Sequence, residues 1–333
     1  TRTELEQALQ KWDDLRRRLE SWTSLTSLHF SQDTRAEDYK EAQENSNELQ
    51  PKLTALAVEM KRKLLSSEKR AELTEILGEQ AFNLWEADVT TFEPVIEADL
   101  VEEAKLVNKY VELIASAEIE FAGKTLNLSG LRKYTQDRDR SIRYQAETAR
   151  WNFFRENQER LDEIYRKLVK LRHQMAQKLG YNNYIELGYK RMQRIDYTEA
   201  DVANYRDEVV QEVVPLAKKI IAQKAEKLNI DKVYFWDESV FDLQGNPTPK
   251  GEYDWMIQQA RQMFDTMHPE LGNFFRMMVE GNLLDLKNRP GKAGGGFCTS
   301  FPSYDVPYIF ANFNGTKDDV EVFTHEMGHA FQN

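Results

Sequence analysis

The feature that most constrains this chain is the run His325-Glu326-Met327-Gly328-His329. Two imidazoles four residues apart leave the same face of an α-helix, because four residues turn through about 400° and rise about 6 Å. One nitrogen of each ring can then reach a single zinc ion at about 2.0–2.1 Å. Glu326 would lie beside the metal, where a carboxylate can take a proton from a metal-bound water. The sequence therefore predicts zinc ligands at His325 and His329 and a general base at Glu326. The alternative, a surface helix with two histidines by chance, is disfavoured because the chain has only five histidines.

The residues before this motif predict a helix that can hold it. Thr316 is placed as an N-cap, with Asp319 as its capping-box partner. Apolar residues then recur at helical spacing and form one face, made of Val320, Phe323, Met327 and Ala330. Since the two histidines lie to one side of that face, the helix can pack on a core and still present metal ligands.

The composition describes a globular protein and argues against several partners. The 333 residues carry a net charge of −11, and 11% of them are aromatic, which does not fit a disordered chain. The acidic balance argues against nucleic acid or an anionic membrane as the main partner. No apolar run approaches the roughly 20 residues that span a bilayer. The charged N-terminal residues argue against a retained signal peptide. The single cysteine, Cys298, excludes an internal disulfide framework and predicts a cytoplasmic location.

The apolar spacing predicts a mainly helical chain, and its length allows two domains. We expect an N-terminal helical domain at 1–190 and a second domain, which carries the motif, at 191–333. Beyond a first helix through Leu5–Trp22, helical runs are expected at about 35–65, 68–84, 98–117 and 138–179. The period changes to alternation around Gly123, which predicts a small β-hairpin within about 117–130. The helical run that follows should end at Gly180.

A capping box at Thr198–Asp201 predicts another long helix to about Leu228, and Pro215 should kink or split it. The prolines and glycines of 242–251 predict a loop, and two shorter helices should start near Tyr253 and Leu271. Three isolated histidines, which we interpret as packed or solvent-facing residues and not as ligands, are His29, His173 and His268.

A second informative stretch runs from Pro290 to Thr299 and contains three consecutive glycines. It does not match a phosphate-binding loop, because that pattern needs a glycine where Leu286 stands and a serine or threonine where Ala293 stands. We expect a flexible turn joined to strands at about 297–301 and 307–313. Glycines leave the backbone open to close approach, so an extended peptide could pair with the edge strand ending near Phe313; an ordinary hairpin loop is an equal alternative. The candidate peptide-binding residues are Gly294, Gly295, Gly296, Ala311, Asn312 and Phe313.

Taken together, these residues resemble the thimet-oligopeptidase and oligoendopeptidase F group of zinc metallopeptidases. The matching segments are 291–298, 307–313 and 325–331. The upstream helices and residues 117–192 also look like the oligoendopeptidase F branch, so the likeness covers most of the chain. The resemblance implies a two-lobed, zincin-like helical fold with a small β-sheet beside the catalytic helix. It also implies a substrate channel between the lobes that admits short unfolded peptides.

The sequence departs from the family pattern after the motif. The resemblance implies a third zinc ligand, a glutamate on a second helix beyond the motif, and a downstream tyrosine and histidine that bind substrate and steady the oxyanion. Only Ala330-Phe331-Gln332-Asn333 follow His329. The sequence therefore looks like the first part of such an enzyme. We expect residues 1–333 alone to bind zinc poorly, to cleave no peptide and to expose an apolar patch around the last helix.

The function that these observations favour is a zinc-dependent endopeptidase acting on short unfolded oligopeptides, with one zinc ion per active site. A zinc carboxypeptidase of similar helical fold is an alternative, since a site that captures a free C-terminus is not excluded. A non-catalytic helical binding module that retains the motif is the alternative from another class. The sequence does not indicate an oligomeric state.

Overall fold

The computed structural model describes residues 2–332 and is mainly helical, with two small sheets. The chain forms two compact units, each built from three segments. The first contains residues 1–12, 41–110 and 159–219, and the second contains residues 13–40, 111–158 and 220–333. In the described residues, no helix is both long enough and apolar enough to cross a bilayer. The expected domain bounds of 1–190 and 191–333 stay a prediction.

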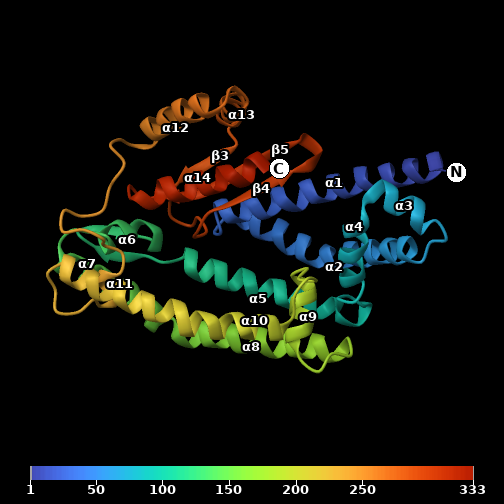
Figure 1. The fold of residues 1–333 in the computed structure, drawn as a ribbon, viewed down its shortest axis with the longest axis horizontal. Helices are drawn as coiled ribbons and strands as arrows, with labels where there is room; N and C mark the ends of the chain where they lie inside the picture. Colours follow the sequence, from blue (N-terminus) through green and yellow to red (C-terminus); the bar gives the residue numbers. More distant parts are fainter. Residues whose placement is uncertain (1, 333) are drawn as a thin grey trace. The chain divides into compact units, whose positions relative to one another are not determined.

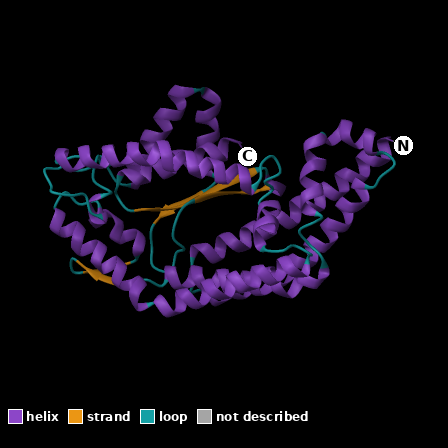
Figure 2. Ribbon diagram, turned by 60° about the horizontal axis from the view of Figure 1, so that its bottom comes forward, coloured by secondary structure: helices purple, strands orange, loops and turns teal. Residues whose placement is uncertain are grey.

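The elements of the first half are mostly helices (Figures 1 and 2). In chain order they are α1 (Arg2–Gln32), α2 (Glu37–Leu65), α3 (Arg70–Leu77), α4 (Glu79–Asp88), the short 3-10 helix η1 (Pro94–Ile96), α5 (Glu97–Ala115), β1 (Ile119–Phe121), β2 (Lys124–Leu126), α6 (Leu128–Thr135), α7 (Arg140–Glu156) and α8 (Gln158–Lys178). The predicted helices at 35–65 and 98–117 and the hairpin within 117–130 are confirmed. The predicted helices at 68–84 and 138–179 are each divided into two. One breaks at Gly78, whose φ of +81° leaves the helical region, and the other breaks at Asn157.

The elements of the second half carry the candidate site. They are α9 (Tyr184–Arg191), α10 (Glu199–Glu208), the π-helical turn η2 (Val209–Val213), α11 (Val214–Lys227), the 3-10 helix η3 (Phe235–Asp237), α12 (Tyr253–Met267), α13 (Pro269–Glu280), β3 (Leu284–Lys287), β4 (Phe297–Phe301), the 3-10 helix η4 (Pro302–Tyr304), β5 (Val306–Phe313) and α14 (Lys317–Gln332). The capping box at Thr198 is confirmed. The expected split at Pro215 is also confirmed, since the π-helical turn lies directly before it, where a proline cannot donate to the preceding turn.

The three-stranded sheet has the order β3-β5-β4, with β3 parallel and β4 antiparallel to β5. Alternate residues of β5 pack on different neighbours. Ile309 and Ala311 lie in a core cluster with residues of α12, α13 and α14, whereas Phe310 packs with Leu28 of α1. Because both faces of β5 are covered, this strand is the centre of the second unit.

The prediction that the strand ending near Phe313 is an edge strand is therefore wrong. β5 pairs on both sides, and the edges of the sheet are β3 and β4. The missed element is β3, which lies parallel to β5, beginning with the pair Leu284 and Ile309. The glycine run directly precedes β4, so an edge strand does follow it, but the edge is β4.

Candidate active site

Helix α14 is fixed to the core by one face. Phe323, Met327 and Ala330 are at most 6% exposed and pack with Phe275 and Ile309. The predicted apolar face is confirmed at these three positions and is wrong at Val320, whose side chain is 49% exposed. The prediction that an apolar patch around this helix is exposed is wrong for the same three residues, which are buried. Their partners come from α13 and β5, within the described chain.

The start of α14 is held differently from the predicted capping box. The Asp319 carboxylate accepts hydrogen bonds from the backbone N–H groups of Asn314 and Gly315, at 2.7–3.1 Å. The Thr316 hydroxyl is buried and makes no hydrogen bond within residues 2–332. The carboxylate thus clamps the loop before the helix, and the reciprocal pairing expected for a capping box is not formed. Burial raises the pKa of Asp319, although the backbone donors oppose that shift.

A second anchor at the same end was not predicted from the sequence. The Asp318 carboxylate accepts from Arg132 Nε at 2.6 Å and from Gln136 Nε2 at 2.7 Å, which ties the first turn of α14 to α6 and the residue after it. Asp318 was treated only as part of a helix start, because its partners lie more than 180 residues away. The helix therefore has its N-terminal turn fixed by ion pairing and its next turns fixed by apolar packing.

The two histidines of the motif lie together on the exposed side of α14. The Nε2 atoms of His325 and His329 are 3.2 Å apart. Two nitrogens that share one tetrahedral zinc ion at about 2.0–2.1 Å lie about 3.3–3.4 Å apart. The pair therefore fits a shared zinc ion with almost no movement. Within residues 2–332, no third histidine, cysteine or acidic side chain joins them to complete a metal-binding group.

The Glu326 residue is 7% exposed, and its carboxylate oxygens keep contact with the surface and make no hydrogen bond or ion pair with residues 2–332. A carboxylate that reaches the surface without a protein partner is available to a bound water or substrate. The neighbouring Met327 is fully buried, so the backbone on either side of Glu326 is held in place. The ring pair and the carboxylate thus share one turn of a well-anchored helix.

The glycine run lies beside the same helix. Gly294, Gly295 and Gly296 are all exposed. A Cβ atom added to Gly294 or Gly295 would meet nothing within 4 Å, whereas one added to Gly296 would lie 2.9 Å from Cγ1 of Val322 on α14. Gly296 is therefore needed for close packing of the β4 start on α14, and the backbone of the other two is open to an incoming molecule. Of the remaining peptide-binding candidates, Ala311 is buried, Asn312 and Phe313 are half-buried, and all three lie on β5.

Sequence reasoning missed the group that lies under this run. Lys292 was read only as part of a failed phosphate-loop pattern, but its ammonium group is fully buried and bonded to the ends of β3 and β5. Burial lowers the pKa of Lys292 to about 8, and the ion pair with Asp285 only partly offsets this. The signal that could have revealed it is a lysine between residues suited to a tight, buried turn.

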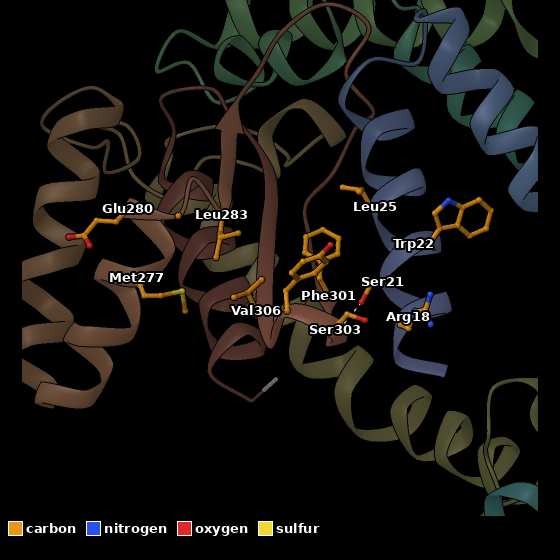
Figure 3. Close-up of a pocket in the computed structure, with 12 residues that line it drawn as sticks. Arg18, Ser21, Trp22, Leu25, Met277, Glu280, Leu283, Phe301, Ser303 and Val306 are labelled. Carbon is orange, nitrogen blue, oxygen red and sulfur yellow. Dashed lines mark hydrogen bonds between the residues drawn. The ribbon is translucent and has the colours of Figure 1, made fainter. Parts of the chain in front are cut away.

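A separate concavity of about 990 Å³ lies on the α1 face of the sheet. Its lining includes Trp22 and Leu25 of α1 and Phe301 and Val306 of the sheet, and Figure 3 shows the hydrogen bond that joins Ser303 to Ser21 of α1. No described residue of α14 and none of the candidate site residues lines it. It therefore does not belong to the candidate site.

Comparison with known families identifies the chain. The model of peptidase family M3 matches residues 133–333, and the model of the peptidase M3 N-terminal domain matches residues 1–92. The chain belongs to peptidase family M3. The resemblance to this family stated from the motifs is therefore confirmed, and M3 peptidases are in general zinc-dependent.

Individual relatives agree with the M3 assignment. A structure of Pz peptidase A with an inhibitor matches with a TM-score of 0.97 and 40% identity, over 99% of this chain and 59% of that one. A Bacillus anthracis (strain Ames) protein provisionally named oligoendopeptidase F matches with a TM-score of 0.97 and 39% identity, over 100% of this chain and 61% of that one. An oligoendopeptidase F homolog from Lactococcus lactis subsp. lactis (strain IL1403) is 21% identical over 199 residues, 60% of this chain and 32% of the relative. The chain thus spans about three fifths of the solved relatives and about a third of the curated one.

Proposed function

We propose that this M3 chain is the motif-bearing part of a zinc-dependent endopeptidase that hydrolyses short unfolded peptides. The observation that carries the proposal is the pair of Nε2 atoms 3.2 Å apart, on the same helical turn as Glu326, whose carboxylate makes no hydrogen bond or ion pair with residues 2–332. Zinc fits this donor set, because both atoms are imidazole nitrogens at the separation that one tetrahedral ion requires.

His325 and His329 would hold the metal, which when bound supplies a Lewis acid for the scissile carbonyl and for water activation. Glu326 takes a proton from the attacking water and returns it to the leaving amine. The packing of Met327 and Ala330 keeps the carboxylate and the rings in register, so little rearrangement is needed when substrate arrives.

The substrate is an extended peptide bound along the outer edge of β4. An edge strand presents unpaired backbone groups to which a peptide can add as a further strand. Gly294 and Gly295, directly before this strand, leave room for the peptide backbone. Substrate side chains make few contacts in such a mode, which suits cleavage of varied sequences. A channel between two lobes that excludes folded proteins, and a cytoplasmic location suggested by the lone Cys298, complete the proposal.

The test is Glu326→Gln in the full-length protein, with Glu321→Gln as the matched control. Glu321 lies on the same helix but is exposed and pairs with Lys317. We expect Glu326→Gln to keep its zinc content and to lose about 10²–10⁴-fold in kcat on an internally quenched peptide, while the control keeps the parent rate. Near-parent turnover with full zinc would show that Glu326 is not the base.

The same assay separates the alternative activities. An endopeptidase cleaves a peptide whose C-terminus is amidated, and mass spectrometry then finds an internal cut. A carboxypeptidase cleaves only the free-acid form, one residue at a time. Binding of the peptide with no cleavage by the zinc-loaded full-length protein would indicate a non-catalytic module.

A further inference from the structure

The buried ammonium group of Lys292 lies where the pairing of β3 and β5 shifts. Asp285 pairs with Phe310 and Lys287 pairs with Phe313, so β5 advances three residues while β3 advances two. Such an irregularity leaves backbone carbonyl groups without their ladder partners. Buried carbonyl groups need another donor, because an unpaired one destabilises the fold.

Lys292 supplies that donor. Its Nζ donates to the backbone carbonyl oxygens of Asp285, Lys287 and Ala311, at 2.9, 3.0 and 2.6 Å, and also lies 2.9 Å from Asp285 Oδ1. The ammonium is 4.4 Å from the centre of the Phe310 ring, in reach of a cation–π contact. With three protons and four oxygen acceptors, the group is fully satisfied although it has no contact with water.

The charge of Lys292 is balanced by Asp285, which is itself held in place. Arg289 binds the Asp285 carboxylate through two nitrogens, each at 2.8 Å, and Gln32 donates to it at 3.1 Å. Burial disfavours the charged form of Asp285, but the bonds from Arg289 and Lys292 outweigh it, so the pKa of Asp285 lies below its usual value. The cluster is therefore a fixed, ionised support at the end of the sheet.

Asn312 lies within the shifted segment of β5 and connects this support to the glycine run. Its Nδ2 donates to the backbone carbonyl oxygens of Ala293 and Gly295, at 2.9 Å in each case. The backbone of residues 293–295 is also held by α1, because the Ala293 N–H group donates to the backbone carbonyl oxygen of Ser31 at 2.8 Å. Gly294, between the two bonded carbonyls, is exposed and has open space around it.

We infer that Lys292 and Asn312 are positioning residues for peptide binding. Lys292 stabilises the shifted pairing of β5. Asn312 lies in that shifted segment and holds the open backbone of residues 293–295 in place for the substrate. This inference rests on the proposed function, since it takes the glycine run to contact the peptide. Neither side chain touches the substrate. Both act through the conformation of the turn.

The experiment measures peptide affinity and catalysis separately in the full-length protein. Peptide Kd is measured by fluorescence anisotropy of a labelled substrate peptide in the Glu326→Gln background, where cleavage does not interfere. The variants are Lys292→Met and Asn312→Ala, and Lys124→Met is the matched control, since Lys124 is an exposed lysine of the β1–β2 hairpin. In the active background, kcat, zinc content and inhibition by acetohydroxamate are measured.

We expect both variants to weaken peptide binding about tenfold, as for the loss of one or two hydrogen bonds that order a binding element. In the active background kcat should stay within about threefold, and zinc content and the acetohydroxamate Ki should not change, because this small inhibitor does not reach the turn. A generally loosened fold would change all four quantities. The double variant should be no worse than the stronger single one, since both act through one segment.

Gly294→Val separates the two proposals. If Gly294→Val weakens the peptide Kd and Asn312→Ala does not, the turn binds peptide but the positioning inference is overturned. If Gly294→Val has no effect, the proposed peptide edge itself is wrong, and the inference fails with it. Asn312→Ala decides the question where Lys292→Met does not fold, because it leaves the buried ammonium and its acceptors in place.

Discussion

Met327 is the residue whose truncation tests how α14 is held. Its side chain is fully buried in the core cluster that contains Phe275 and Ile309. Met327→Ala removes three heavy atoms from this cluster, and methionine-to-alanine changes in well-packed cores cost about 2–5 kcal/mol. Along its apolar face helix α14 is held by three buried residues, with the partly buried Phe331 packed beside them, so most of this cost should fall on opening of the helix.

The assay is amide hydrogen exchange followed by mass spectrometry, on peptides that cover residues 317–332 of the metal-free protein. Metal is omitted because zinc bound to His325 and His329 would stabilise the same helix. A loss of 2–5 kcal/mol corresponds to exchange about 30- to 4,000-fold faster, at about 1.4 kcal/mol for each tenfold change. Peptides from α9, which lies wholly in the other unit, should be unchanged and serve as an internal reference.

Val320→Ala is the matched control on the same helix, because its side chain is 49% exposed. It should change exchange less than about threefold, as expected for a surface position. Equal effects of the two substitutions, or a Met327→Ala effect below tenfold, would refute the packing argument. The helix would then be held mainly by its N-terminal ion pairs.

Three further outcomes are expected. The folded-state pKa of Lys292 is about 8, below its ordinary 10.5, so the unfolded chain binds more protons between these two pH values. The unfolding free energy of the parent should therefore rise by about 2 kcal/mol from pH 7.5 to 10, relative to that of Lys292→Met. Urea titrations at the two pH values measure this change. Burial opposes ionisation of Glu103, but bonds from Arg191 and Arg172 hold its pKa below the usual value. Glu103→Gln should therefore cost about 1–3 kcal/mol at pH 7 in the same titration, and the cost should shrink as pH falls below about 4. Removing the exposed guanidinium of Arg132 by Arg132→Met should cost less than about 1 kcal/mol by exchange at the first turn of α14.

The parts of the structure that the sequence predicted well depend on neighbours in the chain. The ligand spacing of His325 and His329, the capping box at Thr198 and the hairpin around Gly123 each involve residues a few positions apart. Backbone geometry alone fixes such relations, whatever the rest of the protein does. The break at Gly78 was missed because the apolar period continues across it, and only the positive φ of that glycine reveals the change.

The parts that were missed depend on residues far apart in the sequence. Asp318 reaches Arg132 across 186 positions, and Gln32 reaches Asp285 across 253. No periodicity carries information about such pairs, so the anchor of α14 and the distant partners of the Lys292 cluster could not be predicted. Strand β3 was missed for a related reason: it has only four residues, and it is stabilised by its parallel partner β5 and not by a local turn.

The position of β5 in the sheet could have been inferred from a signal that is present in the sequence. Residues 307–311 are almost continuously apolar, which is the pattern of a strand buried on both faces, whereas an edge strand with one wet face alternates. Such a strand has neighbours on both sides, and this leaves β3 and β4 to provide the edges. Of these two, β4 follows the open glycines and lies against α14, where a Cβ atom on Gly296 would meet Val322. The proposed peptide can therefore lie beside Glu326 only along β4. A Gly294→Val protein that bound peptide normally would count against the whole proposed peptide site, and not against one contact in it.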